Sequence, residues 1–394
     1  MNNEKKKGKL VPELRFPGFE GEWPIQPLSN FLHEHKTKSD GKCRVHSVSV
    51  SKGVVDQVEY LGRSFAASDT SKYNLAKPND IIYTKSPTGS FPYGIVKMNK
   101  KPYNVIVSPL YGVYSPTNKY IGYILDSYFE SPERTNTYLS TLIQKGAKNT
   151  IQITNSTFIS KNVCFPTDEA EQQKIAECLS SVDDLIQAEA DQLQALKDHK
   201  KGLMQQLFPQ EGETTPKLRF PGFKGEWEEK KFGELCKTIT PSLKLQSSNY
   251  LKAGKYPIVD QSQSLICGWT NDSKGLISNV PVVIFGDHTC VLKYIDFPFI
   301  QGADGVKILS PQRGYDSRFI YQSFLANPVI QDGYKRHFSE FKEKTYMFPS
   351  LPEQQKIADC LSSLDEGIAA QQEKVEAFRE HKKGLMQKLF PNLQ

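Results

Sequence analysis

One 39-residue segment occurs twice in this chain, and the repeat constrains the fold more than any other sequence feature. The first copy runs from Glu171 to Pro209 and the second from Glu353 to Pro391, with 24 of 39 aligned positions identical. Self-similarity on this scale indicates that the chain is assembled from repeated structural units. Any fold proposed for it must therefore place two equivalent segments in equivalent surroundings.

Each copy shows a heptad pattern of apolar residues, which predicts a long helix with one seam that packs against another helix. The predicted coiled-coil seam consists of Ile175, Leu179, Val182, Ile186, Leu193, Leu196, Ile357, Leu361, Leu364, Ile368, Val375 and Phe378. Polar residues interrupt both seams at matching places, and both copies end at Phe-Pro, where a helix cannot continue. Two near-identical seams would most simply bury each other, although each helix covering only its own domain is an alternative.

A second, shorter repeat precedes the variable parts of the chain. Leu14 to Trp23 reads LRFPGFEGEW, and Leu218 to Trp227 reads LRFPGFKGEW. The chain is therefore two half-molecules, each a motif, a variable region and a helix. The predicted division is 1–23 (N-terminal tail and first motif), 24–166 (first variable domain), 167–209 (central helix), 210–227 (linker and second motif), 228–349 (second variable domain) and 350–394 (C-terminal helix).

Positive charge is concentrated in the two variable regions. Residues 24–166 hold 17 Lys and Arg against 9 Asp and Glu, and residues 228–349 hold 15 against 12, whereas the helix segment 167–209 holds 4 against 9. This distribution suits variable regions that meet a polyanion and helices that meet protein. Both regions alternate β-rich stretches with turns, and helices are predicted at Tyr120–Gln144, interrupted near Pro132, and at Arg318–Lys335.

Other features bound the class of protein. No apolar run is long enough to span a membrane, no secretory signal is recognisable, and the seven cysteines are scattered without a CxxC pair. We therefore expect a cytoplasmic protein with reduced thiols and no membrane association.

No catalytic constellation stands out. Asp168 to Glu171 resembles a helicase acidic box, but no phosphate-binding GxxxxGK[ST] loop accompanies it. Glu340 and Lys342 have the E-x-K spacing of many nucleases, and His288 with Cys290 could suggest zinc, but both patterns are common by chance. We predict no catalytic residue and no metal site.

The doubled LRFPGF-x-GEW motif, the helix starts EQQKIA at Glu171 and Glu353, and the endings GLMQ-x-LF resemble the specificity subunit of type I restriction-modification enzymes. The resemblance covers nearly the whole chain. It implies an α+β fold with two target recognition domains, separated by an antiparallel two-helix coiled coil and related by an internal two-fold pseudo-repeat. It further implies a non-catalytic subunit that reads a bipartite double-stranded DNA target.

The same resemblance implies partners and cofactors. Two methyltransferase (modification) subunits and restriction (translocase and nuclease) subunits would dock on this chain. AdoMet, ATP and Mg²⁺ would belong to those partners, with no cofactor in this chain. By position within the recognition domains, the residues expected to face DNA are Lys85, Ser86, Thr88, Lys145, Lys148, Asn149, His288, Arg336, His337, Lys342 and Lys344. The competing interpretations are a nuclease or fused restriction-modification enzyme, and a scaffold that binds only protein.

Overall fold

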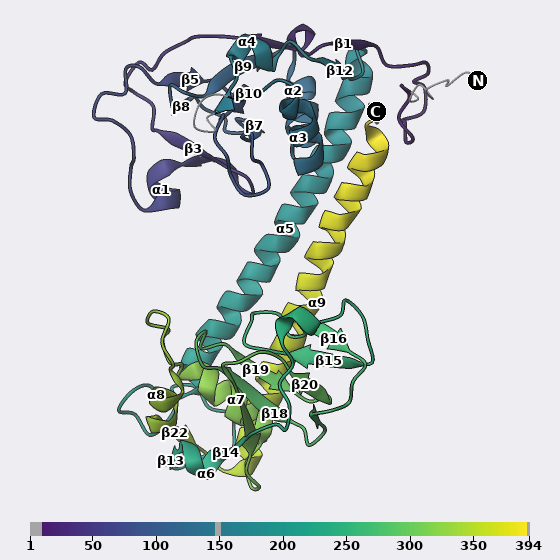
Figure 1. Cartoon of the computed structure of the whole chain (residues 1–394). Coiled ribbons are helices and arrows are strands. Elements are labelled where there is room, and N and C mark those ends of the chain that lie inside the picture. Colours follow the sequence, from purple (N-terminus) through teal and green to yellow (C-terminus); the bar gives the residue numbers. More distant parts are fainter. Residues whose placement is uncertain (1–9, 146–150, 392–394) are drawn as a thin grey trace, which may run out of the picture. The chain divides into compact units, whose positions relative to one another are not determined.

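The computed structural model describes residues 10–145 and 151–391. The chain forms two compact units, the first made of residues 1–189 and 374–394 and the second of residues 190–373. Each unit contains one domain of mixed strands and helices, together with one half of each long helix, α5 (Glu169–Leu207) and α9 (Leu351–Leu389) (Figure 1). Both helices are 39 residues long, in keeping with the repeated segment that each contains.

The first sheet has the same strand order in both units. All its neighbouring strands are antiparallel. In unit 1 the order is β2 (Leu32–Glu34), β9 (Gly112–Pro116), β6 (Ile81–Tyr83) and β7 (Val96–Met98), and in unit 2 it is β14 (Cys236–Ile239), β21 (Val306–Pro311), β18 (Val282–Gly286) and β19 (Leu292–Ile295). The two equivalent inner strands, β6 and β18, are fully buried, in keeping with their Ile, Val, Tyr and Phe residues.

Four further strands also correspond, although they form one sheet in unit 2 and two strand pairs in unit 1. In unit 2 the order is β16 (Gly268–Thr270), β15 (Tyr256–Val259), β20 (Phe299–Gln301) and β17 (Leu276–Ile277). Unit 1 has the hairpin β3 (His46–Ser49) and β4 (Gly53–Asp56) and the pair β5 (Asn74–Ala76) and β8 (Val105–Val107). A parallel bridge from Val45 to Ile106 joins them, as β15 and β20 are joined in parallel in unit 2. The two domains therefore have one topology, although their sequences hardly match.

A further strand pair closes each domain. β1 (Ile25–Pro27) pairs with β12 (Asn162–Cys164), and β13 (Glu228–Lys231) pairs with β22 (Thr345–Phe348). The remaining elements are η1 (Leu28–Asn30), α1 (Gln57–Leu61), α2 (Lys119–Phe129), α3 (Pro132–Ser140), β10 (Gln144–Lys145), β11 (Ile151–Gln152), α4 (Asn155–Phe158), α6 (Phe232–Leu235), η3 (Ser247–Asn249), α7 (Ser317–Ala326) and α8 (Phe338–Glu343).

Helix α7 is shorter than the sequence predicted. It starts at the N-cap Asp316, whose carboxylate accepts from the backbone N–H groups of Arg318 and Phe319, but it ends at Ala326 and not near Lys335. Pro328 explains the early end, because the residue before a proline is disfavoured in the helical conformation. Residues 327–337 form a loop instead.

The repeated motif ties the ends of the two long helices together within each unit. Arg15 makes a two-pronged ion pair with Glu171 at the start of α5 (2.7 and 2.9 Å), and Leu14 N–H donates to the Lys388 carbonyl near the end of α9 (3.0 Å). In unit 2, Arg219 donates to Glu353 at 2.7 Å through Nε and again through Nη2, and Leu218 N–H donates to the Gln206 carbonyl (2.9 Å). The motif is therefore a structural clamp.

The two long helices pair antiparallel in both units. In unit 1, Ile175 and Leu179 of α5 share a hydrophobic cluster with Met386 and Leu389 of α9. In unit 2, Leu207 shares one with Ile357 and Leu361. Low residue numbers in one helix meet high numbers in the other, which confirms the antiparallel prediction. Every predicted seam residue is buried or half-buried.

The two lysines in the seam are satisfied by charge pairs. Lys382 contacts Asp183 (2.6 Å) and Glu130 (2.5 Å) in unit 1, and Lys200 contacts the equivalent Asp365 (2.6 Å) in unit 2. Burial opposes the charge on Lys382, but the two carboxylates together raise the pKa of this ammonium above its usual value.

Candidate nucleic-acid interface

The predicted DNA-facing segments lie at equivalent places in the two first sheets. Lys85, Ser86 and Thr88 follow β6, while Asp287, His288 and Thr289 follow β18, and these two strands hold the same position in the strand order. Topology therefore makes two loops equivalent that have no sequence similarity. Loops at the ends of rigid strands are where binding residues are commonly placed.

The loop after β6 is tightly built. Thr84 Oγ1 accepts from Ile95 N–H (3.1 Å), and the backbones of Thr88 and Phe91 bond to each other. Lys85 has a positive φ of 56°, and a side chain at Gly94 would meet its backbone nitrogen at 2.9 Å, so glycine is required there. Ser86 and Thr88 are exposed, whereas Lys85 is half-buried, and this burial lowers the pKa of its ammonium.

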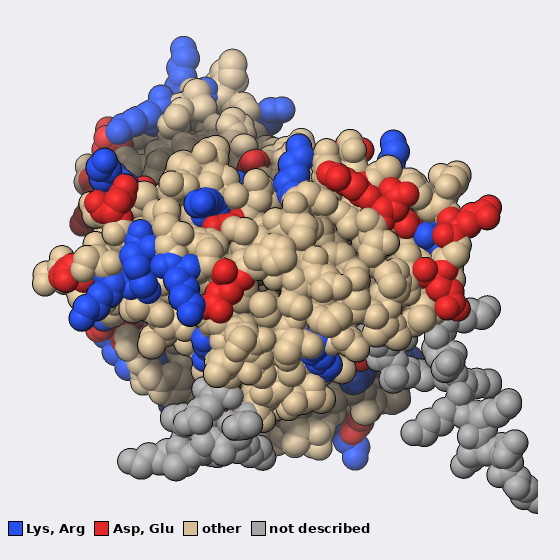
Figure 2. All heavy atoms as spheres, turned by 90° about the horizontal axis from the view of Figure 1, so that it is seen from above, with Lys and Arg blue, Asp and Glu red and all other residues tan. Residues whose placement is uncertain are grey.

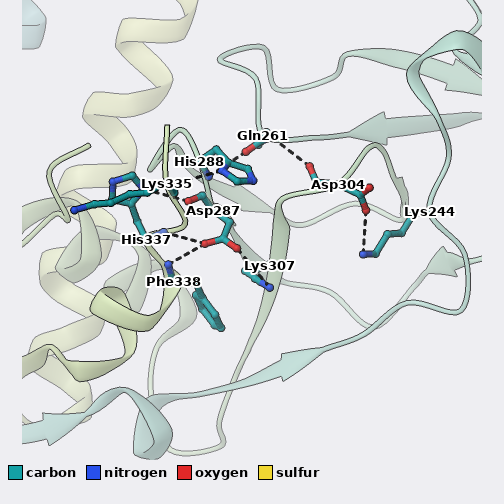
Figure 3. Close-up of polar contacts among 9 residues, drawn as sticks. All are labelled: Lys244, Gln261, Asp287, His288, Asp304, Lys307, Lys335, His337 and Phe338. Atoms are coloured by element: carbon teal, nitrogen blue, oxygen red, sulfur yellow. Dashed lines mark hydrogen bonds and ion pairs between the residues drawn. The ribbon is translucent and has the colours of Figure 1, made fainter. Parts of the chain in front are cut away.

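In unit 2 the loop after β18 is organised by Asp287, which is only 2% exposed. Its Oδ1 accepts from the N–H groups of His337 (3.0 Å) and Phe338 (2.9 Å), and Lys307 Nζ lies 3.7 Å from Oδ2. Figure 3 shows this carboxylate between the chain at His337 and Phe338 and the side chain of Lys307. Asp287 thus caps the start of α8 from another element and fixes the loop at residues 327–337 against the sheet end.

The structure corrects the role of His337. This side chain has no exposed surface, its Nδ1 lies 3.2 Å from the Asp287 carbonyl oxygen, and its Nε2 accepts from Asp332 N–H at 3.0 Å. Nδ1 must therefore carry the proton. His337 closes the loop from inside and is not placed to contact DNA.

Lys344 is committed within the protein in a similar way. Its Nζ reaches the carbonyl of Asn327 (3.2 Å), the side-chain oxygen of Asn327 (2.7 Å) and the carbonyl of Pro328 (2.7 Å). Since an ammonium has three donors, none is left for a phosphate. Burial lowers its pKa. We therefore interpret Lys344 as a residue that positions the loop after α7.

The other predicted contacts remain predictions. Arg336 and Lys342 are exposed on and beside the loop, and His288 is half-buried beneath it. Lys145 is in strand β10, where only the backbone is described. Lys148 and Asn149 lie outside the described residues.

Sequence reasoning missed two residues of this region. Gln261, after β15, accepts from His288 N–H at 3.3 Å and donates to the Asp304 carbonyl at 3.2 Å, so it links three loops (Figure 3). Tyr334 is 87% exposed on the loop itself. An aromatic residue just before Lys335 and Arg336 was the available signal for Tyr334, whereas nothing local marks Gln261.

Surface charge is unevenly distributed. Figure 2 views the molecule from above relative to Figure 1, and the face it shows has a broad uncharged area with Lys and Arg in separate groups around it.

Two further observations concern the residues of the alternatives based on metal chemistry. Glu340 and Lys342 are exposed on the short helix α8. Within residues 10–145 and 151–391, no three His, Cys, Asp or Glu side chains are grouped so as to hold a metal ion. In the same ranges, no helix is long and apolar enough to cross a bilayer.

The fold and its loops define a class of protein. The chain is duplicated, and its two halves have the same strand order but carry different loops at the strand ends. A family model for the type I restriction modification DNA specificity domain matches residues 51–198 and again residues 224–377. The chain therefore belongs to this family and contains two such domains.

Two relatives extend the comparison. The specificity subunit of the type I restriction enzymes EcoR124I and EcoR124II of Escherichia coli is 24% identical over 144 residues, which are 36% of this chain and 34% of that protein. The match spans about a third of the relative's length. The crystal structure of a type I restriction-modification S subunit from M. genitalium has a TM-score of 0.62 at 15% identity, covering 98% of this chain and all of that one. It shares the fold.

Proposed function

We propose that this chain is the non-catalytic DNA-recognition subunit of a type I restriction-modification complex. Each α+β domain would read one half of a bipartite duplex target. The observation that carries the proposal is the identity of strand order in two domains whose loops after β6 and β18 differ completely. A constant frame with variable loops is what two independent specificities on one chain require.

The proposal assigns the spacing of the two half-sites to the helix pair. A 39-residue helix is about 58 Å long at 1.5 Å per residue. Dimeric DNA readers contact half-sites roughly 34–36 Å apart, or one helical turn. Lengthening α5 and α9 by one matched heptad each would change the number of unread bases and leave both half-sites alone.

Partners follow from the same proposal. The exposed flanks of the helix pair would dock two methyltransferase subunits, and the assembled complex would recruit restriction subunits in the cytoplasm. AdoMet, ATP and Mg²⁺ would bind those partners. Purified chain alone is expected neither to methylate nor to cleave DNA with these cofactors present. Turnover that disappears on changing Glu340 or Lys342 would support the nuclease alternative.

The decisive experiment is a region exchange read by methylation sequencing. Cells carrying the complete system should methylate one bipartite motif, and cells lacking this chain should not. Replacing residues 24–166 with the first region of another family member should change one half of the motif and preserve the other half and the gap. A change in both halves would refute independent reading by two domains.

A further inference from the structure

The loop at residues 330–337 of unit 2 exposes large side chains in an ordered setting. Tyr334 is 87% exposed and Ile330 is 80% exposed, the two highest values among the large apolar side chains of the described ranges. A single exposed apolar residue needs no explanation. The contacts around Tyr334, however, show that the loop is held in place from beneath.

Three buried or half-buried groups hold the loop. The Asp287 carboxylate accepts from two backbone N–H groups at its end, and the buried ring of His337 accepts from Asp332 N–H. The His288 carbonyl accepts from the side chain of Gln331 at 3.0 Å. The loop therefore needs little ordering when a ligand arrives, which lowers the entropic cost of binding.

Tyr334 is also stacked. Its ring lies parallel to that of His288, with centroids 4.7 Å apart and an angle of 8° between the planes. His288 is itself fixed by Nδ1, 3.2 Å from the Lys335 carbonyl, and by its backbone N–H, which donates to Gln261 at 3.3 Å. One face of the tyrosine ring is backed by a second aromatic ring, while most of the side chain stays open to solvent.

Cations flank this stack. Lys335 and Arg336 follow Tyr334 directly and are both exposed, with Lys335 2.9 Å from Asp332. Proteins that bind nucleic acid place cations on phosphates and aromatic or apolar side chains on or between bases. The geometry thus combines both kinds of contact within three consecutive residues.

We propose that Tyr334, backed by His288, packs as a wedge against one base step of the half-site read by unit 2 and determines base preference at that step. This inference rests on the proposed function. A wedge favours steps that unstack easily, so it selects sequence without hydrogen bonds to base edges. Lys335 and Arg336 would hold neighbouring phosphates.

The test uses the complete complex containing Tyr334→Ala, Tyr334→Phe or the double variant Lys335→Ala/Arg336→Ala. Tyr334→Ala should weaken binding to the cognate duplex about tenfold to a hundredfold and relax one position of the second half-site in methylation sequencing. Its salt dependence should stay unchanged, since no charge is lost. The double variant should instead weaken all duplexes and flatten the salt dependence.

The controls separate the possible outcomes. Tyr334→Phe keeps the ring and should keep the motif; if it fails as badly as Tyr334→Ala, the hydroxyl is the contact and the wedge is wrong. Tyr103→Ala, a tyrosine 52% exposed in unit 1, should leave the second half-site unchanged. Wild-type motif and affinity in Tyr334→Ala would refute the wedge while leaving the proposed function intact. If the wild-type complex has no bipartite motif, the proposed function itself fails.

Discussion

The strands of units 1 and 2 correspond in order and pairing, but the units differ in the segment that comes after the helix on the first sheet. In unit 1, α2 leads into α3 and the hairpin β10–β11, whereas in unit 2, α7 leads into the loop at residues 327–337. Arg134 of α3 donates to the Met386 carbonyl at 2.9 Å and lies over the Phe390 ring. The equivalent Met204 and Phe208 line an open cavity of about 1190 Å³ in unit 2.

The difference shows where this frame tolerates change. Insertions after α2 or α7 leave the sheets, the clamp and the helix seam intact, because those elements bond among themselves. The segment that varies is also the one that reaches the loops after β6 and β18, through Asn136 to Ser90 in unit 1 and through His337 to Asp287 in unit 2. A change of length there alters the candidate DNA surface without unfolding the domain.

The largest expected difference in stability between the two units concerns the clamp formed by the repeated motif. Arg219→Ala leaves the carboxylate of Glu353, which is 1% exposed, without its ion-pair partner. The substitution should destabilise unit 2 by about 3 kcal/mol. Arg15→Ala should cost unit 1 less, since Trp23 Nε1 still donates to Glu171 at 3.2 Å, whereas Trp227 Nε1 has no hydrogen-bond partner within the described ranges.

Hydrogen exchange on the full chain, resolved by unit, measures both losses. Lys224→Ala is the matched control, since this lysine is exposed in the same motif and should change nothing. Equal losses in the two units would show that the tryptophan bond contributes little.

A smaller difference in stability between the two units is expected at the lysines in the helix seam. Lys382→Ala removes one partner from each of two carboxylates and should cost about 2 kcal/mol, while Lys200→Ala removes one partner from a single carboxylate and should cost about 1 kcal/mol. Both values are set below those of fully buried pairs because the carboxylates are partly exposed. Urea titration of the two variants gives the order, and the reverse order would contradict these pairings.

The smallest expected effect is a gain. Gly367 lies within α9 where α5 has Leu185, and an added Cβ would meet nothing within 4 Å. Gly367→Ala should therefore stabilise the chain by roughly 0.5–1 kcal/mol through helix propensity. Gly202→Ala and Gly384→Ala, at equivalent open positions in the two helices, are the comparison variants. A shift of the urea midpoint to lower concentration for Gly367→Ala alone would mean that α9 needs its glycine there.

The sequence by itself determined the repeated architecture. Heptad spacing predicted the two helix seams, Ile175 to Leu196 and Ile357 to Phe378, and the Phe-Pro pairs predicted the helix ends. Both signals are local, because helix periodicity and proline geometry act over a few residues. The β-rich stretches of both variable regions were predicted from local composition for the same reason. The positions of the DNA-facing residues came from the resemblance, and apart from His337 and Lys344 they are still predictions.

Only the tertiary structure decided which distant groups meet. Arg15 and Glu171 are 156 residues apart, and Asp287 and His337 are 50 apart, so no local pattern links them. The same holds for the burial of His337 and the stacking of Tyr334 on His288, which a charged segment between Asp332 and Lys344 does not reveal. Whether a polar side chain serves the interior or the surface depends on the partners that the fold brings to it, and those partners are set by the topology of the sheets.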